Sequence, residues 1–135
     1  MAERSASMWF WALAAVLIAA APPVWAQQFP FEREMVLDEK PMPGSKRVPI
    51  LEILADGRAM IDLWCKSGEG RAEIKGDTIT FTLGPMREDG CTPERLQRDE
   101  DLAKALAQVT EWQLDDDEVV VLIGPTELRY RLSTH

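Results

Sequence analysis

The chain has 135 residues, and its 15 Lys and Arg against 23 Asp and Glu give a formal net charge of −8 at pH 7. An acidic chain without a basic stripe argues against nucleic acid and anionic membranes as partners. Its one histidine, His135, is the last residue, and chain ends usually fray, which excludes the familiar histidine-dependent triads and metal sites.

The N-terminus has the pattern of a cleavable secretory signal peptide. An apolar run from Met8 to Ala21 is followed by Pro22-Pro23 and then by Val24-Trp25-Ala26, which fits a cleavage site. We predict cleavage after Ala26 and a periplasmic or secreted location. The alternative is a retained membrane anchor, but the proline pair would end a helix before the ~20 apolar residues that a span needs. Membrane association is expected only if this segment is retained.

The first half of the remaining chain predicts strands and turns. Residues 27–48 predict a short strand at Glu34–Leu37 and then a proline-rich loop. Residues 50–54 and 58–65 flank Asp56-Gly57, the signature of a tight β-hairpin. Alternation within the second strand places Cys65 on the same face as Ala59, so we expect Cys65 to point inward.

The next segment alternates between loop and strand signals. Residues 67–70, Ser-Gly-Glu-Gly, predict a loop, and residues 71–75 predict a short strand. Residues 78–83 form the clearest strand pattern, because three apolar side chains alternate with three threonines. We expect Gly84-Pro85 to end that strand.

One helix is predicted, from Pro93 to Val109. Thr92 is a suitable cap and Pro93 fits the first helical position. Leu102, Leu106 and Val109 form one apolar stripe. Strands at 110–114, 118–123 and 127–132 follow. The predicted fold class is α+β, a curved antiparallel β-sheet of about seven or eight strands packed against a single α-helix.

The order of these elements resembles the META domain, a small exported module also found in HslJ-like heat-shock proteins. The resemblance covers roughly Pro49 to Leu132 and is carried by the following segments: Asp56-Gly57, Lys75–Phe81, Gly84-Pro85, Cys91-Thr92-Pro93, Leu102–Thr110 and Val119–Leu122. Trp64-Cys65-Lys66 stands where the family often has Gly-Cys-Asn. The resemblance implies a curved sheet around one helix and an envelope or stress association, without a known reaction.

The expected organisation has three parts. Residues 1–26 form the signal peptide, 27–48 the N-terminal strand and proline-rich loop, and 49–135 the META-like domain. Residues 27–135 are expected to fold as a single unit.

Cys65 and Cys91 are the only cysteines and are predicted to form a disulfide. An exported chain meets an oxidising compartment, where two thiols most simply pair. Such a bond closes a loop of 26 residue steps and stabilises the fold by about 3.5 kcal/mol in the chain-entropy model. The alternatives are a redox-active thiol or a metal ligand, but the chain has neither a Cys-x-x-Cys pair nor four zinc ligands.

Other candidate sites are weaker. Trp64 and Trp112 are candidates to line a ligand cleft, although both are placed on strands, where packing is the commoner use. The run Asp115–Glu118 offers oxygen ligands for calcium but lacks EF-hand spacing, which favours a solvated turn.

The function predicted from the sequence is that of a non-enzymatic exported envelope protein of META/HslJ type, which binds a partner or supports stress tolerance. One alternative is a small-ligand carrier that uses the concave face of the sheet. A hydrolase built from carboxylates alone is a third hypothesis. We expect no cofactor, no bound metal, an unknown envelope protein or small ligand as partner, and a monomer.

Overall fold

A computed structural model describes residues 28–88 and 90–133 of the chain. The predicted signal peptide and His135 lie outside these residues. The described residues form eight strands and one helix: β1 (Met35–Leu37), β2 (Ile50–Ile53), β3 (Arg58–Asp62), β4 (Ser67–Lys75), β5 (Thr78–Arg87), α1 (Pro93–Ala107), β6 (Glu111–Asp115), β7 (Val119–Ile123) and β8 (Leu128–Leu132). The predicted fold class, with one antiparallel sheet and one helix, is confirmed.

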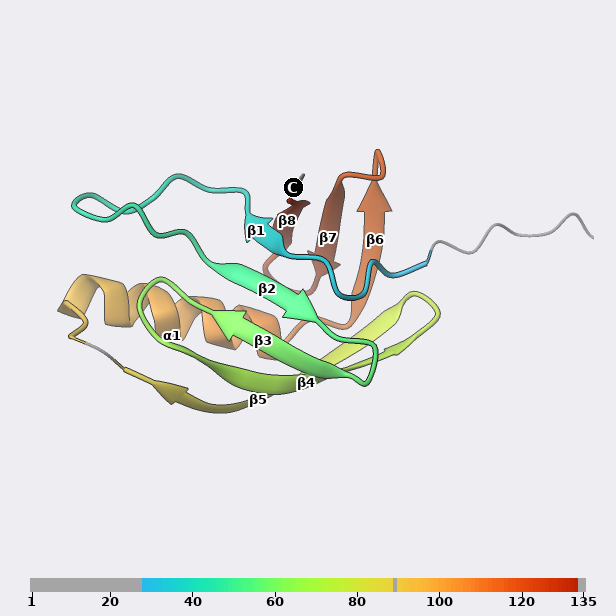
Figure 1. Ribbon diagram of the computed structural model, residues 1–135, viewed down its shortest axis with the longest axis horizontal. Coiled ribbons are helices and arrows are strands. Elements are labelled where there is room, and N and C mark those ends of the chain that lie inside the picture. Colours follow the sequence, from blue (N-terminus) through green and yellow to red (C-terminus); the bar gives the residue numbers. More distant parts are fainter. Residues whose placement is uncertain (1–27, 89, 134–135) are drawn as a thin grey trace, which may run out of the picture.

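The sheet closes into a barrel, because each strand pairs antiparallel with the next and β1 pairs with β8. The pairing between β5 and β6 is the least extensive in the barrel, since it has a single register pair, Thr78 with Glu111. Helix α1 forms the connection between these two strands and packs against β5 (Figure 1). The helix therefore covers the side of the barrel where strand pairing is least extensive.

Alternating side chains fill the inside of the barrel. The strand β3 buries Ala59 and Ile61, and β8 buries Leu128, Tyr130 and Leu132. Burial raises the pKa of the Tyr130 phenol, and the nearby carboxylate of Glu39 adds to this effect. One cluster of buried side chains includes members from all eight strands and the helix. The interior is thus a packed core.

The helix begins as predicted. The Thr92 hydroxyl accepts a hydrogen bond from the Arg95 amide at 3.3 Å, and Pro93 occupies the first turn. Leu102, Leu106 and Val109 are all buried, which confirms the apolar stripe. The helix ends at Ala107, two residues before the predicted end, and Val109 lies in the connection to β6.

Two predicted interruptions are wrong, because both segments lie inside strands. Residues 67–70 belong to β4, and Gly84-Pro85 belong to β5. The glycines permit a close approach of these two strands: a Cβ on Gly68 would lie 2.5 Å from the Pro85 carbonyl oxygen, and one on Gly84 would lie 2.6 Å from that of Glu69. A register shift between Gly68 and Gly70 accommodates the proline, which has no amide hydrogen to donate.

The prediction that Cys65 points inward from a strand is also wrong. Strand β3 ends at Asp62, and the Leu63 amide donates to the Lys66 carbonyl oxygen at 2.8 Å, which turns the chain. Leu63 and Trp64 are both buried although they are neighbours, so strand alternation has stopped before the cysteine. Cys65 is half-buried in the connection between β3 and β4.

The close approach of β4 and β5 makes Gly70 sensitive to substitution. A Cβ at this position would collide with the Thr82 carbonyl oxygen. We expect Gly70→Ala to lower the free energy of unfolding by about 2 kcal/mol, measured by urea denaturation. The control is Gly76→Asn, in a turn with φ of 60° and no heavy atom within 4 Å of an added Cβ. Equal effects of the two substitutions would contradict this account of the glycines.

Candidate functional site

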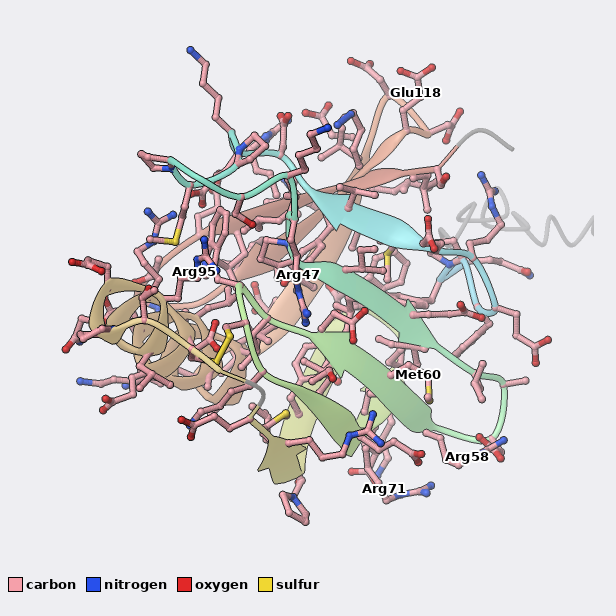
Figure 2. The ribbon with its side chains drawn as sticks, turned by 60° about the vertical axis from the view of Figure 1, so that its left-hand side comes forward. Arg47, Arg58, Met60, Arg71, Arg95 and Glu118 are labelled. Carbon is pink, nitrogen blue, oxygen red and sulfur yellow. A yellow bond between two sulfur atoms is a disulfide. The ribbon has the colours of Figure 1, made fainter. Side chains whose placement is uncertain are left out.

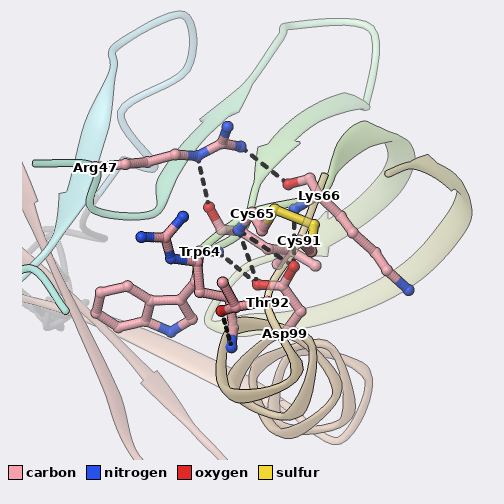
Figure 3. The surroundings of a disulfide bond; sticks show 9 residues. Arg47, Trp64, Cys65, Lys66, Cys91, Thr92 and Asp99 are labelled. Atoms are coloured by element: carbon pink, nitrogen blue, oxygen red, sulfur yellow. Dashed lines mark hydrogen bonds between the residues drawn. A yellow bond between two sulfur atoms is a disulfide. The ribbon is translucent and has the colours of Figure 1, made fainter. Parts of the chain in front are cut away.

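The predicted disulfide is present and joins the β3–β4 connection to the residue before the helix cap. The Cys65 and Cys91 sulfur atoms are 2.02 Å apart, and the two Cα atoms are 5.8 Å apart. Both cysteines are therefore taken up by this bond, and no free cysteine occurs among the described residues. Figure 3 shows the bond beside the first turns of α1.

A buried carboxylate lies next to the disulfide. Asp99 is 1% exposed and faces the β3–β4 connection from α1. Its oxygens accept hydrogen bonds from three successive backbone amides: Trp64 at 2.6 Å, Cys65 at 3.1 Å and Lys66 at 2.7 Å (Figure 3). A buried charge is costly unless it is hydrogen-bonded, and these amides meet that requirement. The carboxylate holds the turn against the helix.

The carbonyl groups of the same turn are bound from the other side. The guanidinium of Arg47 donates to the Leu63 carbonyl oxygen at 3.1 Å and to that of Lys66 at 3.0 Å. Asp99 and Arg47 thus satisfy the amides and the carbonyls of one short turn, and the disulfide adds a covalent link. These bonds identify the cluster as a structural anchor.

The two tryptophans predicted as ligand residues lie in different parts of the core. The Trp64 ring is buried, with the guanidinium carbon of Arg98 4.3 Å from its centroid. Arg98 also forms an ion pair with Glu39 at 2.9 Å. These residues border a surface cleft of about 180 Å³ between α1 and the strand ends. A ligand role for Trp64 stays a prediction.

Trp112 packs at the turn of the β4–β5 hairpin, at the opposite end of β4 from Trp64. Its indole nitrogen donates to the Gly76 carbonyl oxygen at 2.8 Å, and its ring meets Phe29 edge-on at 5.1 Å. Phe29 in turn contacts Phe31, whose ring centroid is 5.2 Å away. Trp112 therefore connects the hairpin turn to the N-terminal segment, and a ligand role for it also stays a prediction.

A surface cleft lies beside this aromatic row. The cleft, here called the Phe31 cleft, has a volume of about 450 Å³ and is lined by residues that include Phe31, Asp56, Gly57, Arg71, Glu73 and Ile74. Phe31 is 40% exposed and is one of two exposed large apolar side chains among the described residues. The volume falls within the range of about 300–1,000 Å³ typical of ligand pockets.

Charged groups at the rim of the Phe31 cleft are partly paired. The Asp56 carboxylate accepts hydrogen bonds from the amide and the guanidinium of Arg58, and these bonds hold its pKa below the ordinary value. The guanidinium of Arg71 donates to the Asp56 carbonyl oxygen at 2.9 Å. Figure 2 shows Arg58 and Arg71 close together at this end of the sheet.

A second cleft, of about 320 Å³, opens on the outer face of β3, β4 and β5. Met60, which is 39% exposed, lines it together with Glu69 and Pro85. The two exposed large apolar side chains of the described residues, Phe31 and Met60, therefore each line a cleft that also includes residues of β4.

The acidic run forms the turn between β6 and β7. Asp116 and Asp117 have φ angles of 52° and 58°, and Asp115 forms an ion pair with Arg129 at 2.9 Å. Within residues 28–88 and 90–133, no group of three His, Cys, Asp or Glu side chains is arranged to hold a metal ion. The same residues include no helix of the length and apolarity that crossing a membrane requires.

Sequence reasoning missed Asp99, Arg47 and Phe31. A signal existed for Asp99, because it precedes Leu102 by three residues and Leu106 by seven, on the buried stripe of the helix. An acidic residue in an apolar stripe indicates a buried hydrogen-bonded carboxylate. Arg47 and Phe31 lie in irregular segments, where no periodic pattern predicts their contacts.

These features define a small, disulfide-bonded antiparallel β-barrel with one covering helix. The family model of the META domain matches residues 31–133. The chain therefore belongs to the META domain family, and the match includes β1, which lies before the region of resemblance expected from the sequence.

Comparison with solved structures finds a protein from Burkholderia xenovorans, determined by NMR, with a TM-score of 0.62 and 16% sequence identity. The alignment covers 90% of this chain and all of that chain. At this identity the likeness supports the fold. Comparison with curated proteins finds no match.

The role of Asp99 leads to a stability prediction. We expect Asp99→Leu to lower the free energy of unfolding by about 3 kcal/mol or more, because the amides of Trp64, Cys65 and Lys66 lose their acceptor while buried. The measurement is urea denaturation of the oxidised protein. The control is Asp101→Asn, an exposed carboxylate on the same helix, with a change below about 0.5 kcal/mol. Wild-type stability of Asp99→Leu would show that the turn does not depend on the carboxylate.

Proposed function

We propose that this protein is a non-enzymatic module that is exported to the cell envelope and binds a partner protein through the outside of its barrel. The observation that carries the proposal is the filled interior of a disulfide-bonded barrel. Side chains such as Met35, Ile53 and Tyr130 are buried inside it, which leaves the outer clefts as binding surfaces. A carrier that uses the concave face would need that space to be open.

The compartment assigned in this proposal rests on two independent features. Structural disulfides persist in oxidising compartments, and the Cys65–Cys91 bond is a structural one, held beside Asp99. Residues 1–26 have the pattern of a signal peptide. A stress role follows from the resemblance to HslJ-like proteins alone. The net charge of −8 favours a soluble monomer.

Thiol labelling in cells tests the export of the protein. We expect the full chain to lose residues 1–26, to begin at Gln27 and to show no thiol that reacts with a maleimide before reduction. A matched chain that starts with methionine followed by residues 27–135 should stay in the reducing cytosol and show two reactive thiols. Mass spectrometry of both proteins gives the cleavage site and the thiol count. A full chain with two reactive cytosolic thiols would refute export.

Partner binding is tested by crosslinking in the envelope. A photo-reactive residue is placed in turn at exposed positions on each face of the exported barrel, such as Met60, Thr82 and Gln97. We expect adducts of one defined mass, confined to positions on one face. Adducts at no position, or equally at all positions, would remove the proposal of a specific partner.

A further inference from the structure

Strand β4 has an open edge beside the Phe31 cleft. Strand β3 begins at Arg58 and pairs with β4 only as far as Arg71. One further bond, from the Ala72 amide to the Gly57 carbonyl oxygen at 2.8 Å, completes the contact. Beyond it β4 continues to Lys75, paired on its other side with β5. In Figure 1 this hairpin extends past the turn between β2 and β3.

The backbone of Ile74 faces this open side. Backbone groups along a strand alternate between its two neighbours, so the N–H and C=O of Ile74 point the same way as the Ala72 amide. In the described part of the chain no strand pairs with β4 at Ile74 on that side. Ile74 also lines the Phe31 cleft. An unpaired strand edge is a template for another strand.

The two faces of this edge differ chemically. Phe31 packs on the buried Phe29, so it borders the cleft from the core side. Arg71, Glu73 and Lys75 are exposed on the outer face, and no ion pair of the Glu73 carboxylate occurs among the described residues. Since side chains of an added strand would alternate between these faces, apolar residues would meet Phe31, and charged residues of both signs would meet Glu73 and Lys75.

The edge is also held in position. The Trp112 indole binds the Gly76 carbonyl oxygen, and the Trp112 amide donates to that of Asp77 at 3.0 Å. The Thr78 hydroxyl donates to the Lys75 carbonyl oxygen at 2.8 Å. These bonds fix the hairpin turn from the β5 side, opposite the open edge. A fixed edge reduces the ordering cost of binding.

We propose that the edge of β4 at Ile74 binds an extended segment of a partner protein in which apolar residues alternate with charged residues of both signs. The segment adds a strand beyond the turn between β2 and β3, with backbone hydrogen bonds to Ile74. A basic residue of the segment would face Glu73, and an acidic residue would face Lys75. This inference rests on the proposed function, because it names the surface and the chemistry of the segment that binds there.

The test uses the oxidised protein of residues 27–135 and the blocked peptide acetyl-KVEVKV-amide, followed by NMR of the ¹⁵N-labelled protein. We expect the amide of Ile74 to be among the largest shifts. The same peptide N-methylated at every residue should bind at least tenfold more weakly, because it cannot donate backbone hydrogen bonds. The peptide acetyl-KVKVKV-amide should also bind more weakly, because Lys75 repels the lysine that lies opposite it.

Matched variants separate charge, apolar contact and fold. We expect Glu73→Gln to weaken binding of acetyl-KVEVKV-amide about threefold and Phe31→Ser about fivefold. The control is Glu69→Gln, an exposed carboxylate on the same strand outside the Phe31 cleft, with a change below about 1.5-fold. Thermal denaturation of each variant verifies that it is folded at the temperature of the binding measurement.

The outcomes distinguish this inference from the proposed function. No binding at millimolar peptide, equal binding of the N-methylated peptide, or shifts confined to other faces would overturn the β4 site. The proposed function would survive any of these results, because crosslinking on another face would still identify a partner surface. Failure of export or of crosslinking at every face would remove the proposed function, even with the peptide bound at Ile74.

Discussion

The carboxylate of Asp99 is the interaction on which the arrangement of helix and barrel depends. It is buried and would be costly there without its three backbone amides. Those amides belong to the turn that leads from β3 into β4, while Asp99 belongs to α1. The bond therefore fixes the helix relative to the sheet, at the end of β4 opposite the hairpin turn where β5 and β6 share one register pair. The disulfide and the guanidinium of Arg47 act on the same turn, so three different interactions limit its movement.

The local pattern of the sequence was sufficient for most of the elements. Alternation predicted the strand at residues 78–83, and the threonine and proline before the helix predicted its start. The local pattern failed at Ser67–Gly70 and Gly84-Pro85, because glycine and proline are typical of loops. Here the glycines serve the close approach of two paired strands. Only the partner strand distinguishes these two uses of glycine, and a local pattern does not include the partner.

Closure of the sheet and the Phe31 cleft were beyond local reasoning for the same physical reason. The pairing of β1 with β8 joins residues almost a hundred positions apart, and no periodicity within either strand specifies it. Phe31 is an ordinary apolar residue in the sequence and becomes part of a cleft through contact with Phe29. Asp99 differs, since its spacing to Leu102 and Leu106 is a local signal of burial, although sequence reasoning missed it.

Strand β4 connects the anchored end of the molecule to the open one. Its first residue, Ser67, directly follows the turn held by Asp99, Arg47 and the disulfide. Its last residues run past β3 to the Phe31 cleft, where Trp112 holds the hairpin turn. Because both ends are fixed, the backbone groups at Ile74, which no described strand pairs, keep a defined direction. A short edge forms few hydrogen bonds with an added strand. It binds an extended partner only when the groups that form these bonds lose little conformational freedom on binding. The anchor near the disulfide thus contributes to binding from the far end of the strand.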